Sequence, residues 1–300
     1  MAPSPHSRRM ASVIGLLIGD AVGTTNEFQP PGSFDPITDL VGGGPFELPA
    51  GAYTDDGAMA LCLAESLLER QGFDEHDQMS RYVRWWREGH LSSTGVCFDI
   101  GGTTRTALAR FEVTGNPIAG STRRNTAGNG SVMRLAPVVA WAAAFPERAV
   151  ELARLSSRTT HAAVEAVDGC GLLARLLLQG YRGEPVTAVL EDVPRDWTAA
   201  LQEVAGMAGA PGEAPPRPPT GYVVDTLVCA RWCVARGESF RDAVLLAANL
   251  GGDADTIAAV TGQLAGAIHG MEGIPPEWLA RLANRERVLE LAEGVAAEQG

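Results

Sequence analysis

Apolar and small residues recur at spacings of three and four along most of the chain, which is the pattern of helices that bury one face. Segment 11–23, ASVIGLLIGDAVG, has small residues between its large apolar ones, and this predicts a tightly packed buried helix. Segment 55–72 has acids in its first turn, Arg70 in its last turn and Gly72 just beyond. This order of charges complements the helix dipole, and we expect the helix to stop at Gly72.

Further segments carry the same helical spacing, and none shows the sustained alternation of a strand. These predicted helices cover residues 78–89, 101–111, 132–144, 147–156, 161–180, 196–206, 221–236, 239–249, 254–269 and 277–298. About a dozen helices without a sheet predict an all-α fold.

Proline and glycine crowd together in segment 205–221, AGMAGAPGEAPPRPPTG. Such a segment is either a domain boundary or an exposed loop. The apolar helices on its two sides have the same character, so we expect an exposed loop within a single domain that spans residues 1–300.

The excess of acidic over basic side chains bears on which macromolecules the protein can bind. The chain has 36 acidic and 24 basic side chains, a formal net charge of −12, which argues against nucleic-acid or anionic-membrane binding. The apolar run near the N-terminus is too short to span a bilayer and has no convincing cleavage site, so we expect a core helix and no membrane partner. The five cysteines are scattered, and Cys229 and Cys233 lack a second pair for zinc. We expect reduced thiols and a cytoplasmic protein.

Two adjacent carboxylates, Asp55 and Asp56, follow Thr54 at the start of one predicted helix. Threonine followed by acids is a common helix cap, so this trio alone could cap the helix or bind a metal.

A second helix start, GGDADT, carries the same chemistry in Asp253, Asp255 and Thr256. Brought together, the two helix starts offer four carboxylates and two hydroxyls, an all-oxygen set suited to Mg²⁺ or Mn²⁺. Because four neighbouring carboxylates repel one another, we expect one or two divalent ions between them.

Five separated stretches act as motifs: GLLIGDAVGTTNEF, YTDDGAMA, STGVCFDIGGTTRTAL, GNGSVMRLAPV, and GYVVDTLVCARW with NLGGDADTIAAVTGQLAGAIHG. Together they resemble the ADP-ribosylglycohydrolase family, in particular the arginine-specific branch that includes dinitrogenase reductase activating glycohydrolase. Each stretch alone is weak, but all five in the family's order over residues 15 to about 270 are highly specific. The resemblance implies a compact, orthogonally packed all-α fold with a binuclear Mg²⁺ or Mn²⁺ centre.

The resemblance also implies roles for individual residues. The metal ligands that it implies are Thr54, Asp55, Asp56, Asp253, Asp255 and Thr256. Glu27 matches a family acid beside the metals and the substrate ribose, and Asp99 matches an acid that faces the scissile N-glycosidic bond in arginine-specific members. The loop that embraces the distal ribose and diphosphate matches Gly128, Asn129, Gly130 and Ser131, with Met133. His161 aligns with a histidine near the family's active site.

Simpler interpretations of these residues remain open. Glu27 could be a surface acid before a turn, and Asp99 could cap the helix predicted to begin near residue 101. Segment 128–131 could be a flexible turn, although its amides precede an apolar helix, where a phosphate can bind. A lone histidine such as His161 is often structural.

Three more acids, Asp20, Asp168 and Asp225, are expected to hold loops or to orient the ligands. The chain departs from the family in one place: many members have a second threonine directly after the two acids, where this chain has Gly57. That change removes one hydroxyl near the metals or one hydrogen bond at the helix start.

The function implied by the resemblance is hydrolysis of the bond between ADP-ribose and a protein side chain, arginine in the first instance. The metals would hold the ribose hydroxyls and activate a water, with Asp56 or Glu27 as the base and Asp99 protonating the leaving guanidine. Two other functions remain open: hydrolysis of an ADP-ribose linkage to serine, to a nucleic-acid base or in a free metabolite, and binding of ADP-ribose without turnover. The expected partners are ADP-ribose and an ADP-ribosylated protein, recognised by a monomer.

Overall fold

The computed structural model describes residues 2–191, 198–204 and 214–297. Within these ranges the chain forms helices joined by turns and loops, without a β-strand; the extended pairing consists of isolated bridges such as Gly128 with Tyr222. The all-α prediction is confirmed.

The helices of the first half are α1 (Pro5–Gly23), η1 (Thr24–Asn26), α2 (Asp55–Arg70), α3 (Glu75–Glu88), α4 (Gly102–Thr114), η2 (Arg124–Thr126), α5 (Ala136–Trp141) and α6 (Pro146–Arg158). Those of the second half are α7 (Val164–Tyr181), α8 (Val186–Glu191), α9 (Ala199–Val204), α10 (Val223–Arg236), α11 (Phe240–Ala248), α12 (Ala254–His269), η3 (Met271–Gly273), α13 (Pro276–Arg281) and α14 (Arg285–Ala296).

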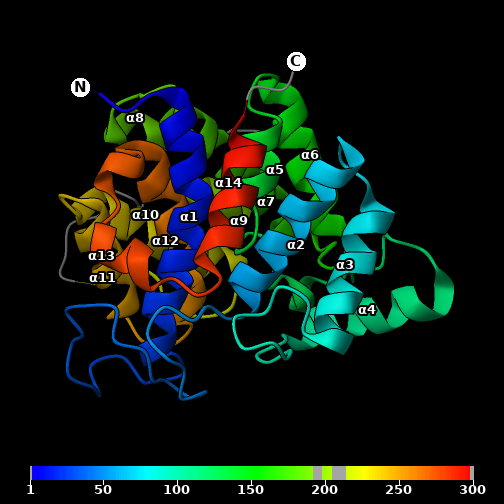
Figure 1. Ribbon diagram of the computed structural model, residues 1–300, viewed down its shortest axis with the longest axis horizontal. Helices are drawn as coiled ribbons and strands as arrows, with labels where there is room; N and C mark the ends of the chain where they lie inside the picture. The colour runs from blue at the N-terminus through cyan, green and yellow to red at the C-terminus, as the bar shows by residue number, and fades with distance from the viewer. Residues whose placement is uncertain (1, 192–197, 205–213, 298–300) are drawn as a thin grey trace.

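Helices α1 and α12 form the centre of the molecule and touch along their backbones (Figure 1). A side chain at Gly15 would collide with the carbonyl oxygen of Gly262, and one at Gly19 with that of Ala258. Small residues four apart on both helices therefore permit this close approach. The pairing also shows that the two helices are antiparallel, so Asp20, near the end of α1, lies on the same side of the pair as the acids at the start of α12.

The other helices surround this central pair. In Figure 1, α14 and α2 lie on one side of α1, with α3 and α4 beyond them, whereas α10, α11 and α13 lie on the other side. One continuous hydrophobic core runs through the described helices and includes large side chains such as Trp85 and Trp278.

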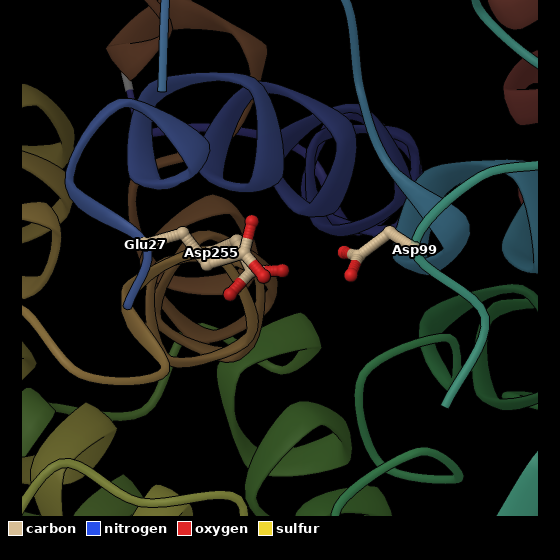
Figure 2. Close-up of side chains that lie close together, drawn as sticks. All are labelled: Glu27, Asp99 and Asp255. Atoms are coloured by element: carbon tan, nitrogen blue, oxygen red, sulfur yellow. The ribbon is translucent and has the colours of Figure 1, made fainter. Parts of the chain in front are cut away.

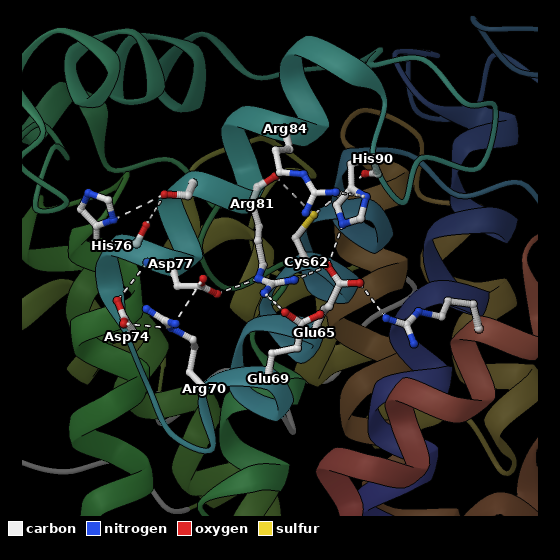
Figure 3. Close-up of polar contacts among 12 residues, drawn as sticks. Cys62, Glu65, Glu69, Arg70, Asp74, His76, Asp77, Arg81, Arg84 and His90 are labelled. Carbon is white, nitrogen blue, oxygen red and sulfur yellow. Dashed lines mark hydrogen bonds and ion pairs between the residues drawn. The ribbon is translucent and has the colours of Figure 1, made fainter.

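A buried ionic network ties α2, α3 and α14 together (Figure 3). Arg81 of α3 is 6% exposed and contacts Glu65 of α2 and Asp77, the latter at 2.6 Å. Glu65 also lies 2.7 Å from His90 and 2.6 Å from Arg287 of α14. Removal of one partner leaves a buried charge unpaired. Single substitutions at the members of this network should therefore destabilise the fold.

Two predicted helices differ in the structure from their sequence ranges. Segment 132–144 contains only the short α5, because the backbone before it pairs with a side chain instead of continuing a helix: Gln263 Nε2 donates to the carbonyls of Val132 and Met133, and its Oε1 accepts from Ala136 N. Segment 277–298 is divided into α13 and α14, because Ala283 N donates to Gly51 O and Asn284 has a φ of 51°.

Smaller differences concern helix ends. The predicted stop at Gly72 is wrong by one residue, because Gln71 adopts the left-handed conformation with φ 52° while Gly72 N donates to Leu67 O. Helix α8 was not predicted. The predicted helix 196–206 appears as α9, with both ends of its range outside the described residues.

The predicted loop 205–221 is described from residue 214 onward, and residues 205–213 lie outside the described ranges. Residues 214–221 alternate between exposed and half-buried positions without a helix. No described helix combines the length and the apolar character needed to cross a bilayer.

Candidate active site

The starts of α2 and α12 meet at one end of the central helix pair, and neither start is capped by its own side chain. Thr54 and Asp253 occupy the two N-cap positions, but no side-chain capping bond is formed at either. At α2 the cap comes from α1, because the Asp20 carboxylate accepts the backbone N–H of Thr54 at 2.9 Å and that of Gly57 at 2.8 Å. Capping is therefore not what the Thr54 hydroxyl does here.

The departure at Gly57 has a local explanation. Its backbone N–H supplies the hydrogen bond to Asp20 at the helix start. A Cβ at residue 57 would lie 2.7 Å from Cδ2 of Tyr53, so the Tyr53 ring occupies the space beside the glycine.

Three acids from different elements point toward one another. Glu27 follows η1, Asp99 precedes α4, and Asp255 lies in the first turn of α12. One carboxylate oxygen from each lies within 4.8 Å of those of the other two, and Figure 2 shows Asp99 facing the adjacent carboxylates of Glu27 and Asp255. Glu27 is only 3% exposed, which rules out its interpretation as a surface acid. Asp99 does not cap α4, whose N-cap is Gly101.

Burial and the charges of neighbouring acids raise the pKa of these carboxyl groups. Burial, followed by the charges of Asp255 and Asp253, raises the pKa of Glu27 to about 10. Burial, followed by the charges of Asp55 and Glu27, raises the pKa of Asp99 to about 10.

The same causes act on the acids at the two helix starts. Burial and the charge of Asp20 raise the pKa of Asp55 and of Asp56 well above the usual range, and burial and Asp253 do the same for Asp255. A cation among these carboxylates would relieve the repulsion.

The unpaired oxygens of this cluster fit such a cation. Thr54 Oγ1, Asp56 Oδ2 and Asp255 Oδ1 are buried without a hydrogen-bond partner in the described structure. Buried polar atoms are nearly always satisfied, so three unsatisfied oxygens in one place indicate a missing ligand for them. The donor set, which Thr256 joins by donating to Asp56 Oδ1 at 3.4 Å, consists of oxygen alone, as hard divalent cations prefer. The cluster could therefore bind a metal.

A cavity of about 250 Å³ opens above these acids. Predicted site residues that line it are Glu27, Asp55, Asp99, Gly128, Asn129, Gly130, Met133, His161, Asp253, Asp255 and Thr256. Thr54, Asp56 and Ser131 do not line it. The first two are buried at the start of α2, whereas Ser131 turns inward, where its hydroxyl accepts from Ser157 at 2.9 Å and from Cys170 at 3.3 Å.

The loop 128–131 is fastened to α10 and α12. Asn129 Nδ2 donates to Thr226 Oγ1 at 2.9 Å and to Asp253, while Asn129 N donates to Gly221 O at 3.0 Å. The segment is thus held in place instead of being a flexible turn. Its contact with Asp253 links it directly to the acid cluster.

His161 closes the cavity behind this loop and is 3% exposed. Its ring packs against Gly130, where a Cβ would lie 2.6 Å from Cε1 of the histidine. Burial, followed by the charge of Arg134, lowers the pKa of His161 to about 3, so the ring is neutral at physiological pH.

Two of the three additional acids hold loops and do not line the cavity. Asp168 accepts from Arg154 and from the backbone of Thr198. Asp225 accepts from Arg217 at 2.6 Å and from the Thr220 hydroxyl.

Sequence reasoning missed part of the cavity wall. The missed lining residues are Phe28, Gly101, Gly102, Thr103 and Thr104. The GGTT run behind Asp99 offered a signal, since small and hydroxyl-bearing residues at a helix start suit ligand contact. Phe28 gave none; it is 63% exposed, with a φ of 61° that is rare for an aromatic residue.

Comparison with known proteins agrees with this arrangement. The family model for ADP-ribosylglycohydrolase matches residues 1–300. The chain belongs to the ADP-ribosylglycohydrolase family. As a member of that family it is a hydrolase of glycosidic bonds.

Individual relatives within the ADP-ribosylglycohydrolase family are similar over most of their length. The ADP-ribosylarginine hydrolase Tri1 of Serratia proteamaculans is 41% identical over 94% of this chain and 77% of its own. The ADP-ribosyl-[dinitrogen reductase] glycohydrolase of Rhodospirillum rubrum is 29% identical over 93% of this chain and 92% of its own. A solved structure described as an ADP-ribosylglycohydrolase-related protein complex matches with a TM-score of 0.87 and 44% identity, covering 98% of both chains.

Proposed function

We propose that this protein removes ADP-ribose from modified arginine side chains of proteins by hydrolysing the N-glycosidic bond, with two divalent cations, Mg²⁺ or Mn²⁺, as cofactors. The observation that carries the proposal is the position of Asp99 opposite Glu27 and Asp255, in a chain 41% identical to proteins named ADP-ribosylarginine hydrolase. The leaving group of that reaction is a guanidine, which a facing carboxyl group can bind and protonate.

The cations would be held by the oxygens of both helix starts. The proposed ligands are Thr54, Asp55, Asp56, Asp253, Asp255 and Thr256. Bound there, a divalent cation would act as a Lewis acid and would lower the pKa of a bound water toward neutrality.

The protein's own acids would carry the proton transfers. Burial, the largest cause, raises the pKa of Asp99, so its carboxyl group can hold a proton and give it to the departing guanidine nitrogen as the C1″–N bond breaks. Glu27 or Asp56, which a cation bound beside it would keep ionised, would accept the proton of the attacking water. Positive charge that develops on the ribose ring would be stabilised by the surrounding carboxylates, because the buried site screens charge poorly.

The cavity residues other than the acids would orient the rest of the substrate. The loop residues Gly128–Gly130, Met133 and the His161 ring line the cavity and suit the distal ribose and diphosphate. The start of α4 adds Thr103 and Thr104 to the lining of the same cavity.

We also propose that residues 1–300 act as one domain and as a monomer in the cytoplasm. The continuous core of the described residues supports the single domain, and free cysteines fit a reducing compartment. Light scattering at the assay concentration measures the oligomeric state.

The test of the proposed reaction compares linkages. Release of ADP-ribose is measured from peptides modified on arginine or on serine, and from an ADP-ribosylated nucleic-acid base, with Mg²⁺ present. We expect release from arginine, and a loss of about 10²-fold or more in Asp99→Asn, the size of a general-acid contribution. Asp35→Asn, which changes an exposed acid, is the matched control and should leave the rate unchanged.

Other outcomes would select the other functions. Turnover of serine or base linkages without arginine would replace the arginine assignment. Binding of ADP-ribose without turnover of any linkage would make the protein a binding module.

A further inference from the structure

A buried cation lies beneath the 128–131 loop. Arg134 is fully buried, and its guanidinium donates from Nη1 to Gly130 O at 2.7 Å and from Nη2 to Thr160 Oγ1 at 2.6 Å. It also stacks 4.7 Å from the centroid of the Tyr82 ring. Among the described residues no carboxylate forms an ion pair with it. Since buried charges are usually paired, a function beyond charge pairing is expected of this side chain.

The contact with Arg134 decides how the Thr160 hydroxyl is used. Arginine can only donate hydrogen bonds, so Thr160 Oγ1 accepts from it. The same oxygen lies 2.9 Å from His161 Nδ1, and Thr160 is fully buried. Within the described structure the hydroxyl hydrogen has no other acceptor than His161 Nδ1. Because a buried O–H is rarely left without an acceptor, Thr160 donates to Nδ1.

This direction fixes the histidine tautomer. A neutral imidazole whose Nδ1 accepts a hydrogen bond carries its proton on Nε2. Nε2 lies on the side of the loop, where a Cβ at Gly128 would be 3.5 Å from it, and His161 lines the cavity. The carbonyl of Gly130 is turned away from the cavity toward Arg134. The part of the cavity wall formed by His161 therefore presents an N–H donor, which suits an anionic group.

We propose that Arg134 and Thr160 are positioning residues that hold His161 as an Nε2–H donor toward the diphosphate of ADP-ribose. The naming of the diphosphate rests on the proposed function, whereas the tautomer follows from the contacts of these three residues alone. Arg134 acts twice: through Thr160 on the ring, and through Gly130 O on the loop that faces the same ligand.

The tautomer can be measured directly by ¹⁵N–¹H correlation spectroscopy of the imidazole rings at neutral pH. The chain has five histidines, and His161→Gln assigns the signal of interest. We expect the Nε2–H form in the wild type and its loss as the dominant form in Thr160→Val, which removes the hydroxyl at nearly constant volume. Thr159→Val is the matched control, since Thr159 is equally buried and bonds to Ser156 O and Gln78 instead.

The ligand is tested by titrating the same proteins with ADP-ribose in Mg²⁺. We expect the Kd to rise about tenfold in Thr160→Val, the loss of one hydrogen bond to a charged group, and to stay within about twofold in Thr159→Val. An Nδ1–H tautomer in the wild type, or an unchanged tautomer in Thr160→Val, would overturn the relay. An unchanged Kd despite a changed tautomer, or no binding by the wild type, would overturn the diphosphate contact. Binding that behaves as expected in a protein that hydrolyses no linkage would leave this inference intact and remove the proposed reaction.

Discussion

The carboxylate of Asp20, at the end of α1, accepts the backbone N–H of Thr54 with both of its oxygens at 2.9 Å. This bond makes a neighbouring helix the cap of α2. Thr54 Oγ1 and Asp56 Oδ2 have no hydrogen-bond partner in the described structure and are free for another ligand. Burial raises the pKa of Asp20 to about 7, and the hydrogen bonds from Thr54 and Gly57 act in the opposite direction.

Asp20→Asn should therefore lower the affinity of the site for metal, although Asp20 is not one of the proposed ligands. Asparagine offers one acceptor oxygen and directs an N–H₂ group at backbone donors, so α2 can no longer start in the same place. We expect about a 10- to 100-fold loss of Mg²⁺ or Mn²⁺ affinity, measured by calorimetric titration. Asp74→Asn is the control, because Asp74 caps α3 far from the cavity; an equal loss in both variants would refute the specific role of Asp20.

A single acid-to-amide change in the cluster should stabilise the protein when metal is removed. In EDTA, Asp255→Asn relieves like-charge repulsion, and we expect the unfolding temperature to rise by about 2 °C or more, the effect of ~1 kcal/mol in a chain of this size. Added Mg²⁺ should raise the unfolding temperature of the wild type, by mass action, and that of the variant much less. A wild type that does not respond to Mg²⁺ or Mn²⁺ would argue against a cation at this cluster.

The Tyr53 hydroxyl should affect turnover as well as stability. Tyr53 Oη donates to Leu91 O at 3.1 Å and accepts from Asn284 at 3.0 Å, and Ser93 Oγ donates to Tyr53 O at 2.6 Å. These bonds fasten the segment that leads to Asp99.

We expect Tyr53→Phe to lose ~1–2 kcal/mol of unfolding free energy and to lower kcat about tenfold or more, because small misplacements of reacting groups are costly. Tyr181→Phe also removes a buried hydroxyl contact, to Ser12 at 2.7 Å, and should lose stability with an unchanged kcat. If the two variants have the same kcat, the segment is not positioned by Tyr53.

The neutral His161 predicts a specific pH dependence of stability. Its pKa of about 3 in the folded protein lies below the value of about 6.5 for an unfolded chain, so the unfolded state takes up the proton first as pH falls. This group therefore destabilises the fold progressively below about pH 6.5 and down to about pH 3.

Between pH 7 and pH 5 the wild type should lose ~2 kcal/mol more unfolding free energy than His161→Gln, measured with denaturant at each pH. Parallel pH profiles for the two proteins would contradict the neutral buried state.

Helical periodicity predicted most helices because their apolar faces meet one core. It failed where the backbone pairs with a distant side chain: Gln263 replaces helical bonds before α5, and Gly51 interrupts the predicted helix 277–298. Such contacts between positions far apart in sequence leave no local pattern.

In the candidate site, too, local sequence patterns were predictive and contacts between distant residues were not. The acids of the two helix starts could be proposed as metal ligands because their residue types and spacing indicate a set of oxygen ligands. The roles of Asp20 and Arg134 depend on hydrogen-bond partners that are distant in sequence. Thr54 illustrates the limit most clearly: its sequence context fits a cap, and only the hydrogen bond that Asp20 accepts from the Thr54 backbone N–H shows that another side chain caps the helix.

The most direct test of a metal centre held by both helix starts measures release of free ADP-ribose from an arginine-ADP-ribosylated protein in Mg²⁺, in Mn²⁺ and in EDTA. It includes Asp55→Ala and Asp253→Ala, one from each helix start, with Asp35→Asn as the control. We expect metal-dependent release by the wild type and the control, and loss of release in both site variants. Release that persists in EDTA, or in either site variant, would contradict the claim that the two helix starts hold the metal on which hydrolysis depends.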